Sequence, residues 1–155
     1  MPALLLPLLA AATAAAPAAG DGLAVFNRLL GRCWEGQMAA DTLDVHCFEP
    51  IYDGAHVRDR HVVLVKGTPV YKGVTYYSRE GRKLTFVYLN SQGGVGQGEA
   101  SPDAAGVCFK GKMRGAPDAG TQAIASCWRW QPDGGYVVTS GSARPVRFVL
   151  SRKRL

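Results

Sequence analysis

The chain has 155 residues, with 18 Lys or Arg against 12 Asp or Glu, and a formal net charge of +6. This length fits one domain with a single core, and no break in composition marks a second domain. The basic charge favours anionic partners such as lipid headgroups or acidic glycans. A solvated basic face is the simpler interpretation.

The first twenty residues carry no charged side chain. Their apolar centre, Leu4–Leu9, is followed by the small residues Ala16-Pro17-Ala18, a pattern that a signal peptidase recognises. We therefore predict a signal peptide over 1–18 and a mature domain over 19–155. The alternative is an uncleaved membrane anchor, but the strongly apolar run is far shorter than the roughly 20 residues that span a bilayer. The prediction is a periplasmic or secreted protein that is not transmembrane and has no nucleic-acid partner.

The chain contains four cysteines, Cys33, Cys47, Cys108 and Cys127. An even number of cysteines in an exported chain predicts disulfide bonds. A structural zinc site would need closer pairs such as C-x₂-C, and the sequence has none.

Hydrophobic residues recur at helical spacing from Leu23 to Leu30, which predicts one short helix that ends at Gly31. The rest of the chain is a series of short β-rich runs separated by Gly, Pro, Asp and Ser, typical of an antiparallel barrel or sandwich. Arg152, Lys153 and Arg154 are expected to form a frayed tail. The predicted strands are Arg32–Met38, Thr42–Phe48, His56–Val65, Val70–Arg79, Lys83–Ser91, Gly94–Ala100, Gly106–Met113, Gln122–Trp130, Tyr136–Ser140 and Val146–Ser151.

Strand alternation predicts how the cysteines pair. If Trp34 and Phe48 point inward, Cys33 and Cys47 both point outward, on either side of a turn near Ala40. They are then placed to form a Cys33–Cys47 disulfide across the hairpin.

The same argument gives Cys108–Cys127 across a turn around Ala116-Pro117-Asp118. The alternative is a long-range disulfide such as Cys33–Cys127.

Catalytic motifs are absent or broken. The sequence has no G-x-S-x-G, and Gly106–Lys112 matches a phosphate-binding loop only until Met113 replaces the required Ser or Thr. His56 and His61 are five residues apart, which puts them on opposite faces of a strand. No spacing of carboxylates singles out an acid/base pair. We predict no catalytic residue and no metal site, which favours a non-enzymatic protein.

An aromatic interior is the best indication of a binding site, because small barrels fill their interior with side chains or hold one small ligand. His46 is expected inside with Trp34 and Phe48, where it would bind a ligand, ligate haem, or simply be buried with a hydrogen-bond partner. The candidate ligand-binding residues are Trp34, His46, Phe48, Tyr76, Tyr88, Asn90, Trp128 and Trp130.

Two segments carry a resemblance to a known family. Phe26–Gly36 resembles the start of lipocalin-like (calycin) barrels, where a short helix leads to a Gly, a Trp and the first strand. Tyr76–Gly94 is similar to small bacterial lipocalin-like proteins of unknown function. The resemblance implies one closed, up-and-down, all-β barrel of about eight to ten strands. It also implies that Arg147 or Arg152 stacks on Trp34.

Together these patterns predict an exported binding protein that holds a small apolar or amphipathic ligand in a barrel cavity, with no cofactor. One alternative is an envelope protein–protein interaction module, an inhibitor or assembly factor, that uses its basic face towards an anionic envelope component. The other is a haem-binding barrel.

Overall fold

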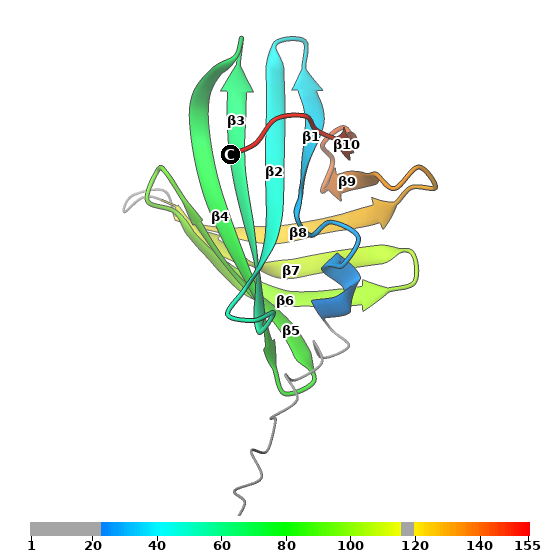
Figure 1. The fold of residues 1–155 in the computed structure, drawn as a ribbon. Helices are drawn as coiled ribbons and strands as arrows, with labels where there is room; N and C mark the ends of the chain where they lie inside the picture. The colour runs from blue at the N-terminus through cyan, green and yellow to red at the C-terminus, as the bar shows by residue number, and fades with distance from the viewer. Residues whose placement is uncertain (1–22, 116–119) are drawn as a thin grey trace, which may run out of the picture.

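The computed structural model describes residues 23–115 and 120–155 (Figure 1). The predicted signal peptide and the Ala116-Pro117-Asp118 turn lie outside these ranges, so both remain predictions. Among the residues that are described, none forms a helix with the length and apolar character needed to cross a membrane.

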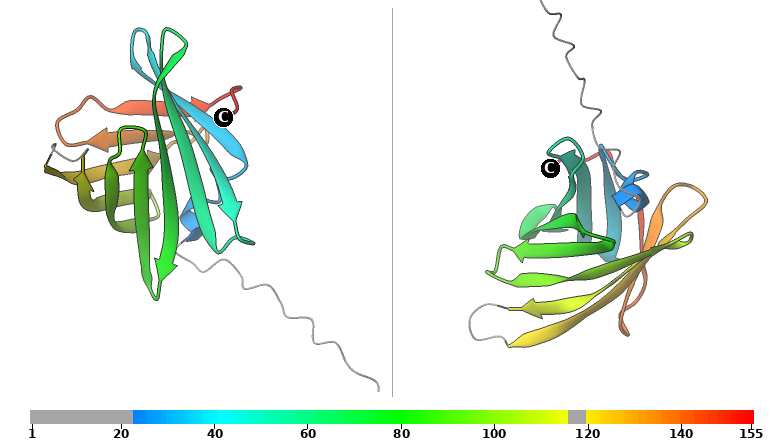
Figure 2. Two further views of the ribbon diagram at one scale, coloured as in Figure 1. Left: turned by 90° about the vertical axis from the view of Figure 1, so that its left-hand side faces the viewer. Right: turned by 90° about the horizontal axis from the view of Figure 1, so that it is seen from below.

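Ten antiparallel strands form a closed barrel in which each strand pairs with its neighbours in sequence and β1 pairs with β10. The predicted all-β, up-and-down barrel is therefore confirmed. Figures 1 and 2 show β1–β4 running across the direction of β6–β8. The strands are β1 Arg32–Ala39, β2 Thr42–Ile51, β3 His56–Val65, β4 Thr68–Glu80, β5 Lys83–Asn90, β6 Val95–Asp103, β7 Gly106–Arg114, β8 Thr121–Trp130, β9 Tyr136–Ser140 and β10 Val146–Leu150.

The period-2 alternation of side chains decides which residues enter the barrel. In β3, Val57 and Asp59 are buried in the interior. The alternate residues Arg58 and Arg60 lie on the outer face, where both pair with Glu49. Inward positions thus carry the core and the candidate site, and outward positions carry most of the charge.

One end of the barrel is closed by the segment before β1. The predicted helix is wrong in type and length, because only a 3-10 turn, η1 Leu23–Phe26, forms. Phe26 and Leu29 are completely buried, and the backbone N–H of Leu29 donates to the carbonyl of Phe26. Leu30 already forms a bridge to Phe48. The described segment between Leu23 and this bridge is only about two helical turns long, too short to stabilise an α-helix by itself.

Both predicted disulfides are confirmed, Cys33–Cys47 and Cys108–Cys127. The members of each pair are directly opposite one another in an antiparallel hairpin. Two disulfides in so small a domain fit an oxidising compartment.

The C-terminal segment does not fray, which corrects the expectation for residues 152–154. It crosses the outer face of β1 to β3, as the red trace in Figure 1 shows. The backbone N–H of Ser151 donates to the carbonyl of Cys33, and Arg60 donates to the carbonyl of Leu155 at 3.0 Å. Near this segment Val45 is completely buried and packs in one cluster with the two cysteines of the first disulfide.

Candidate functional site

The candidate site begins at the hairpin of β2 and β3. Each strand presents an aspartate and a histidine two residues apart, Asp44 with His46 and Asp59 with His61. Residues two apart share a face of a strand, and here that face is the barrel interior. The register pairs His46 directly with His61, and their rings stack with centroids 4.7 Å apart.

His46 lies between two carboxylates. Its Nδ1 is 2.8 and 3.0 Å from the two carboxylate oxygens of Asp59, and its Nε2 is 3.2 Å from Oδ2 of Asp44. The other oxygen of Asp44 is 3.1 Å from Nδ1 of His61. Asp44 therefore bridges the two imidazoles.

Two tyrosines extend the chain of hydrogen bonds. Nε2 of His61 is 3.0 Å from the hydroxyl of Tyr88, which is 2.6 Å from the hydroxyl of Tyr71. Gly73 of β4 makes room for this contact, because a Cβ there would overlap the ring of His61 and approach Tyr88 to 2.6 Å. We call Asp59, His46, Asp44, His61, Tyr88 and Tyr71 the polar chain.

Burial and charge act in opposite directions on the polar chain. Burial tends to lower the pKa of His46, but the carboxylates of Asp59 and Asp44 outweigh it and raise that pKa to about 10. For Asp44, burial tends to raise the pKa, but His46 and His61 hold it well below its usual value. Burial raises the pKa of the Tyr88 hydroxyl, and the contact with Tyr71 adds to the shift.

These shifts predict a pH dependence of folding stability. A folded-state pKa of about 10 against the ordinary 6.5 means that His46 stabilises the fold fully below about pH 6.5 and loses this contribution as the pH rises towards 10. Asp44, whose folded-state pKa is lowered, stabilises the fold fully above its ordinary pKa of 3.8. This contribution is lost as the pH falls into the acid range. Urea unfolding in the presence of a chelator should therefore show stability falling steadily from pH 6.5 to 9.5. A flat profile over that range would show that His46 is not held as a cation.

Aromatic residues surround the polar chain on its inner side, with Trp128 at the centre. The Trp128 ring lies 6.3 Å from His46, 5.7 Å from Phe48, 4.8 Å from Phe109 and 5.2 Å from Tyr136, centroid to centroid. It thus joins the polar chain to the core that fills the closed end.

Two cavities flank Trp128. The first, of about 210 Å³, lies against Thr75, Tyr88, Ile124 and Ser126, and we call it the Ser126 cavity. The second, of about 190 Å³, touches Asp44, His46 and the buried ring of Phe148, and we call it the Phe148 cavity. It also touches Met38 and Arg144, both exposed at the barrel mouth. Each cavity combines apolar walls with one part of the polar chain.

Five of the predicted site residues point into the barrel: Trp34, His46, Phe48, Tyr88 and Trp128. His46 and Phe48 lie beside Trp128, and Tyr88 lines the same cavity as Trp128. Trp34 is a core residue of the closed end, where its Nε1 donates to the carbonyl of Leu29.

The other three predicted site residues lie elsewhere. Tyr76 faces outward, which corrects its expected interior position, because its neighbour Tyr77 is the one in the core. Asn90 accepts the backbone N–H of Gln92 and of Gly94 and so shapes a turn. Trp130 is half-buried under the guanidinium of Arg28, 5.0 Å from the ring centroid. Neither Arg147 nor Arg152 stacks on Trp34 among the described residues, and Arg147 pairs instead with Asp133.

Sequence reasoning missed Asp44, Asp59, His61 and Tyr71. The signal was present in the two D-x-H patterns and in the Asp53-Gly54 turn, which lies midway between His46 and His61. A turn at that midpoint places the two histidines opposite one another. The spacing of the carboxylates singled out no pair in the sequence, and it is the fold that brings Asp44 and Asp59 together at His46. His56 is on the opposite face from His61, as predicted, and contacts Ser78.

Three residues of the polar chain have the chemistry of metal ligands. Each of these residues offers one ligand atom, and the three atoms, from Asp44, His46 and His61, lie within 4.8 Å of one another. A haem on His46 has less support, because both neighbouring cavities are much smaller than a porphyrin.

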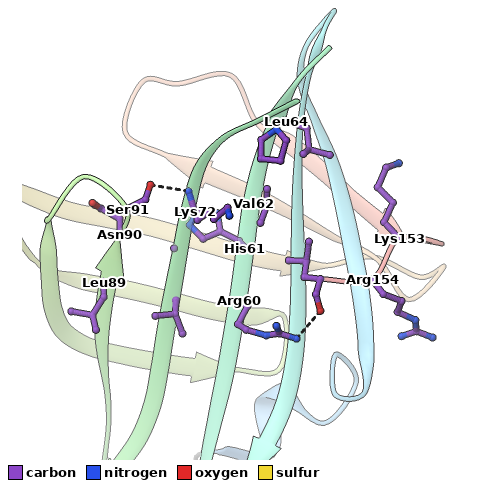
Figure 3. A pocket seen from close by; sticks show the side chains of 14 residues that line it. Arg60, His61, Val62, Leu64, Lys72, Leu89, Asn90, Ser91, Lys153 and Arg154 are labelled. Atoms are coloured by element: carbon purple, nitrogen blue, oxygen red, sulfur yellow. Dashed lines mark hydrogen bonds between the residues drawn. The ribbon is translucent and has the colours of Figure 1, made fainter. Parts of the chain in front are cut away.

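The outer face carries a separate groove of about 790 Å³ (Figure 3). Its apolar part includes Leu64, Val74 and Leu89, and its cations include Lys72 and Arg154. This groove is where the basic face of the barrel meets an exposed apolar surface. His61 is the one member of the polar chain among the described residues that line this groove, which lies outside the barrel.

The closed antiparallel barrel is consistent with a calycin-like fold. No protein-family model matches the chain, and no curated protein sequence is significantly similar to it. Membership of the lipocalin family therefore stays a prediction from the sequence.

Proposed function

We propose that the protein is an exported binding protein that holds a small amphipathic molecule inside the barrel, between Trp128 and the polar chain. The observation that carries this proposal is the position of the two cavities on either side of Trp128, each bordered by apolar walls and by members of the polar chain. Ligand sites have this composition: mostly apolar, with a few converging polar groups that orient the ligand.

The cavity volumes set the size of the ligand. An apolar cavity of about 150 Å³ in another protein binds benzene, and the cavities here are about 210 and 190 Å³. They fit a single ring or a short chain. Its polar group would approach the Tyr88 hydroxyl from the Ser126 cavity, or His46 from the Phe148 cavity.

The test is to titrate metal-stripped protein with a panel of single-ring and short-chain amphiphiles, such as 4-ethylphenol and hexanoate. Isothermal titration calorimetry measures the binding of each compound. We expect Ser126→Leu to weaken binding at least tenfold, because the larger side chain fills the Ser126 cavity. The matched control is Leu89→Ser, which changes an exposed residue of the outer groove.

Three outcomes are informative. Loss of binding in Ser126→Leu with normal binding in Leu89→Ser supports the proposal. The reverse pattern moves the ligand to the outer groove and overturns the interior site. Failure of every member of the panel to bind at millimolar concentration also contradicts it.

A further inference from the structure

Asp44, His46 and His61 do more than satisfy one another's hydrogen bonds. Nε2 of His46 and Nδ1 of His61 both point at the Asp44 carboxylate, from two strands whose register places the rings side by side. All three side chains are largely buried, with relative exposures of 15%, 11% and 10% for His46, His61 and Asp44. This is a built arrangement of two imidazoles and one carboxylate rather than a group of surface acids.

The separations match those of a small metal centre. Ligand atoms about 2.0–2.1 Å from a tetrahedral zinc ion lie roughly 3.3 Å from one another. The Asp44 oxygens are 3.2 Å from Nε2 of His46 and 3.1 Å from Nδ1 of His61. The two nitrogens contact different oxygens of Asp44, and one donor atom from each of the three residues lies within 4.8 Å of the other two. An ion between them would draw these three atoms closer together.

The outer partners of the two histidines have the form that metal sites use. A ligating histidine usually donates its other ring N–H to a carboxylate or another polar group, which fixes the ring and the tautomer. Nδ1 of His46 is held by Asp59, and Nε2 of His61 by the hydroxyl of Tyr88. Each imidazole is therefore oriented with one nitrogen anchored and the other turned towards Asp44.

We propose that Asp44, His46 and His61 bind one divalent cation of the zinc type, through a carboxylate oxygen, Nε2 and Nδ1 respectively. Two histidines and a carboxylate form a common ligand set for zinc and related ions. Binding releases to solvent any proton carried by the ligating nitrogens, and the metal takes the place of the hydrogen bonds to Asp44.

Three protein ligands leave a coordination position open. The Phe148 cavity touches both Asp44 and His46, so the open position would face a space large enough for water or a small donor group. The proposal goes beyond the ligand site and does not depend on it. Metal binding is tested with the ion alone, and ligand binding is tested on metal-stripped protein.

The first experiment uses untagged, chelator-treated mature protein titrated with Zn²⁺ by calorimetry, and with Co²⁺ followed by its visible spectrum. We expect one ion per chain, a micromolar or tighter dissociation constant, and a raised Tm because the ion binds only the folded state. Absence of stoichiometric binding by the wild-type protein overturns the proposal.

The second experiment locates the ion. His61→Gln should weaken binding at least a hundredfold, and Asp59→Asn, which removes an outer partner, should weaken it about 10–100-fold. The matched control is His56→Gln, because His56 lies on the outer face of the same strand. Equal losses in His56→Gln and His61→Gln would place the ion elsewhere and contradict the assignment.

A measurement on the wild type covers the case in which a variant does not fold. X-ray absorption at the zinc edge should show two imidazole nitrogens among the ligands. A spectrum with one imidazole or none overturns the proposal without any substitution.

Discussion

Replacement of His46 by leucine is expected to lower the free energy of unfolding by about 3–5 kcal/mol, the usual cost of removing one partner from a buried ion pair. The side chain of Asp59 is only 2% exposed, and His46 is the only side chain to which the structure assigns it a hydrogen bond among the described residues. The substitution leaves this carboxylate buried without a counter-charge. Urea unfolding at pH 7, compared with wild type, measures the loss.

A second substitution should reverse much of this loss. Replacing a whole buried ion pair with apolar residues of similar volume is often close to neutral. The double variant His46→Leu/Asp59→Leu is therefore expected to be more stable than His46→Leu alone. The control is His56→Leu on the outer face of β3, with an expected cost below about 1 kcal/mol. If the double variant is no more stable than the single one, the cost does not arise from the isolated charge of Asp59.

Loss of either disulfide should also cost about 3 kcal/mol in the chain-entropy model. The bonds join residues 14 and 19 apart in sequence, so loop closure alone predicts nearly equal effects. Burial differs, because Cys33 and Cys47 are 4% and 7% exposed whereas Cys108 and Cys127 are half-buried. Replacing Cys33 and Cys47 with alanine opens space beside Val45, which adds roughly 1 kcal/mol.

The comparison of Cys33→Ala/Cys47→Ala with Cys108→Ala/Cys127→Ala measures this difference directly. Urea unfolding of both variants under the same conditions should show the first to be less stable. The wild type in reducing agent should approach the sum of the two losses. A larger cost for the second pair would show that burial beneath the C-terminal segment does not set the ranking.

Local patterns in the sequence were sufficient for the strands and the disulfides. Side chains alternate strictly along a strand, and a turn halfway between two cysteines places them opposite each other. Cys33–Cys47 and Cys108–Cys127 followed from these two rules, and both bonds form. The same alternation placed His46 inside the barrel, where it is found.

The same rules failed where two adjacent residues were equally suited to the interior. Tyr76 and Tyr77 are both aromatic, and the choice between them depends on the register of β4 against β3 and β5. The residues around Leu23–Leu30 have helical spacing, but the need to cover the open end of the barrel gives a 3-10 turn instead. In both cases partners distant in sequence decided the outcome.

The sequence by itself determined an all-β chain with two hairpin disulfides, because those features depend on side-chain alternation and short turns. Only the tertiary structure decided the polar chain and its cavities. The convergence of Asp44, His46, Asp59 and His61 needs the exact pairing of β2 with β3. Tyr71 and Tyr88 join them through the further pairing of β4 and β5, and cavity volume depends on how all the side chains fill the closed barrel.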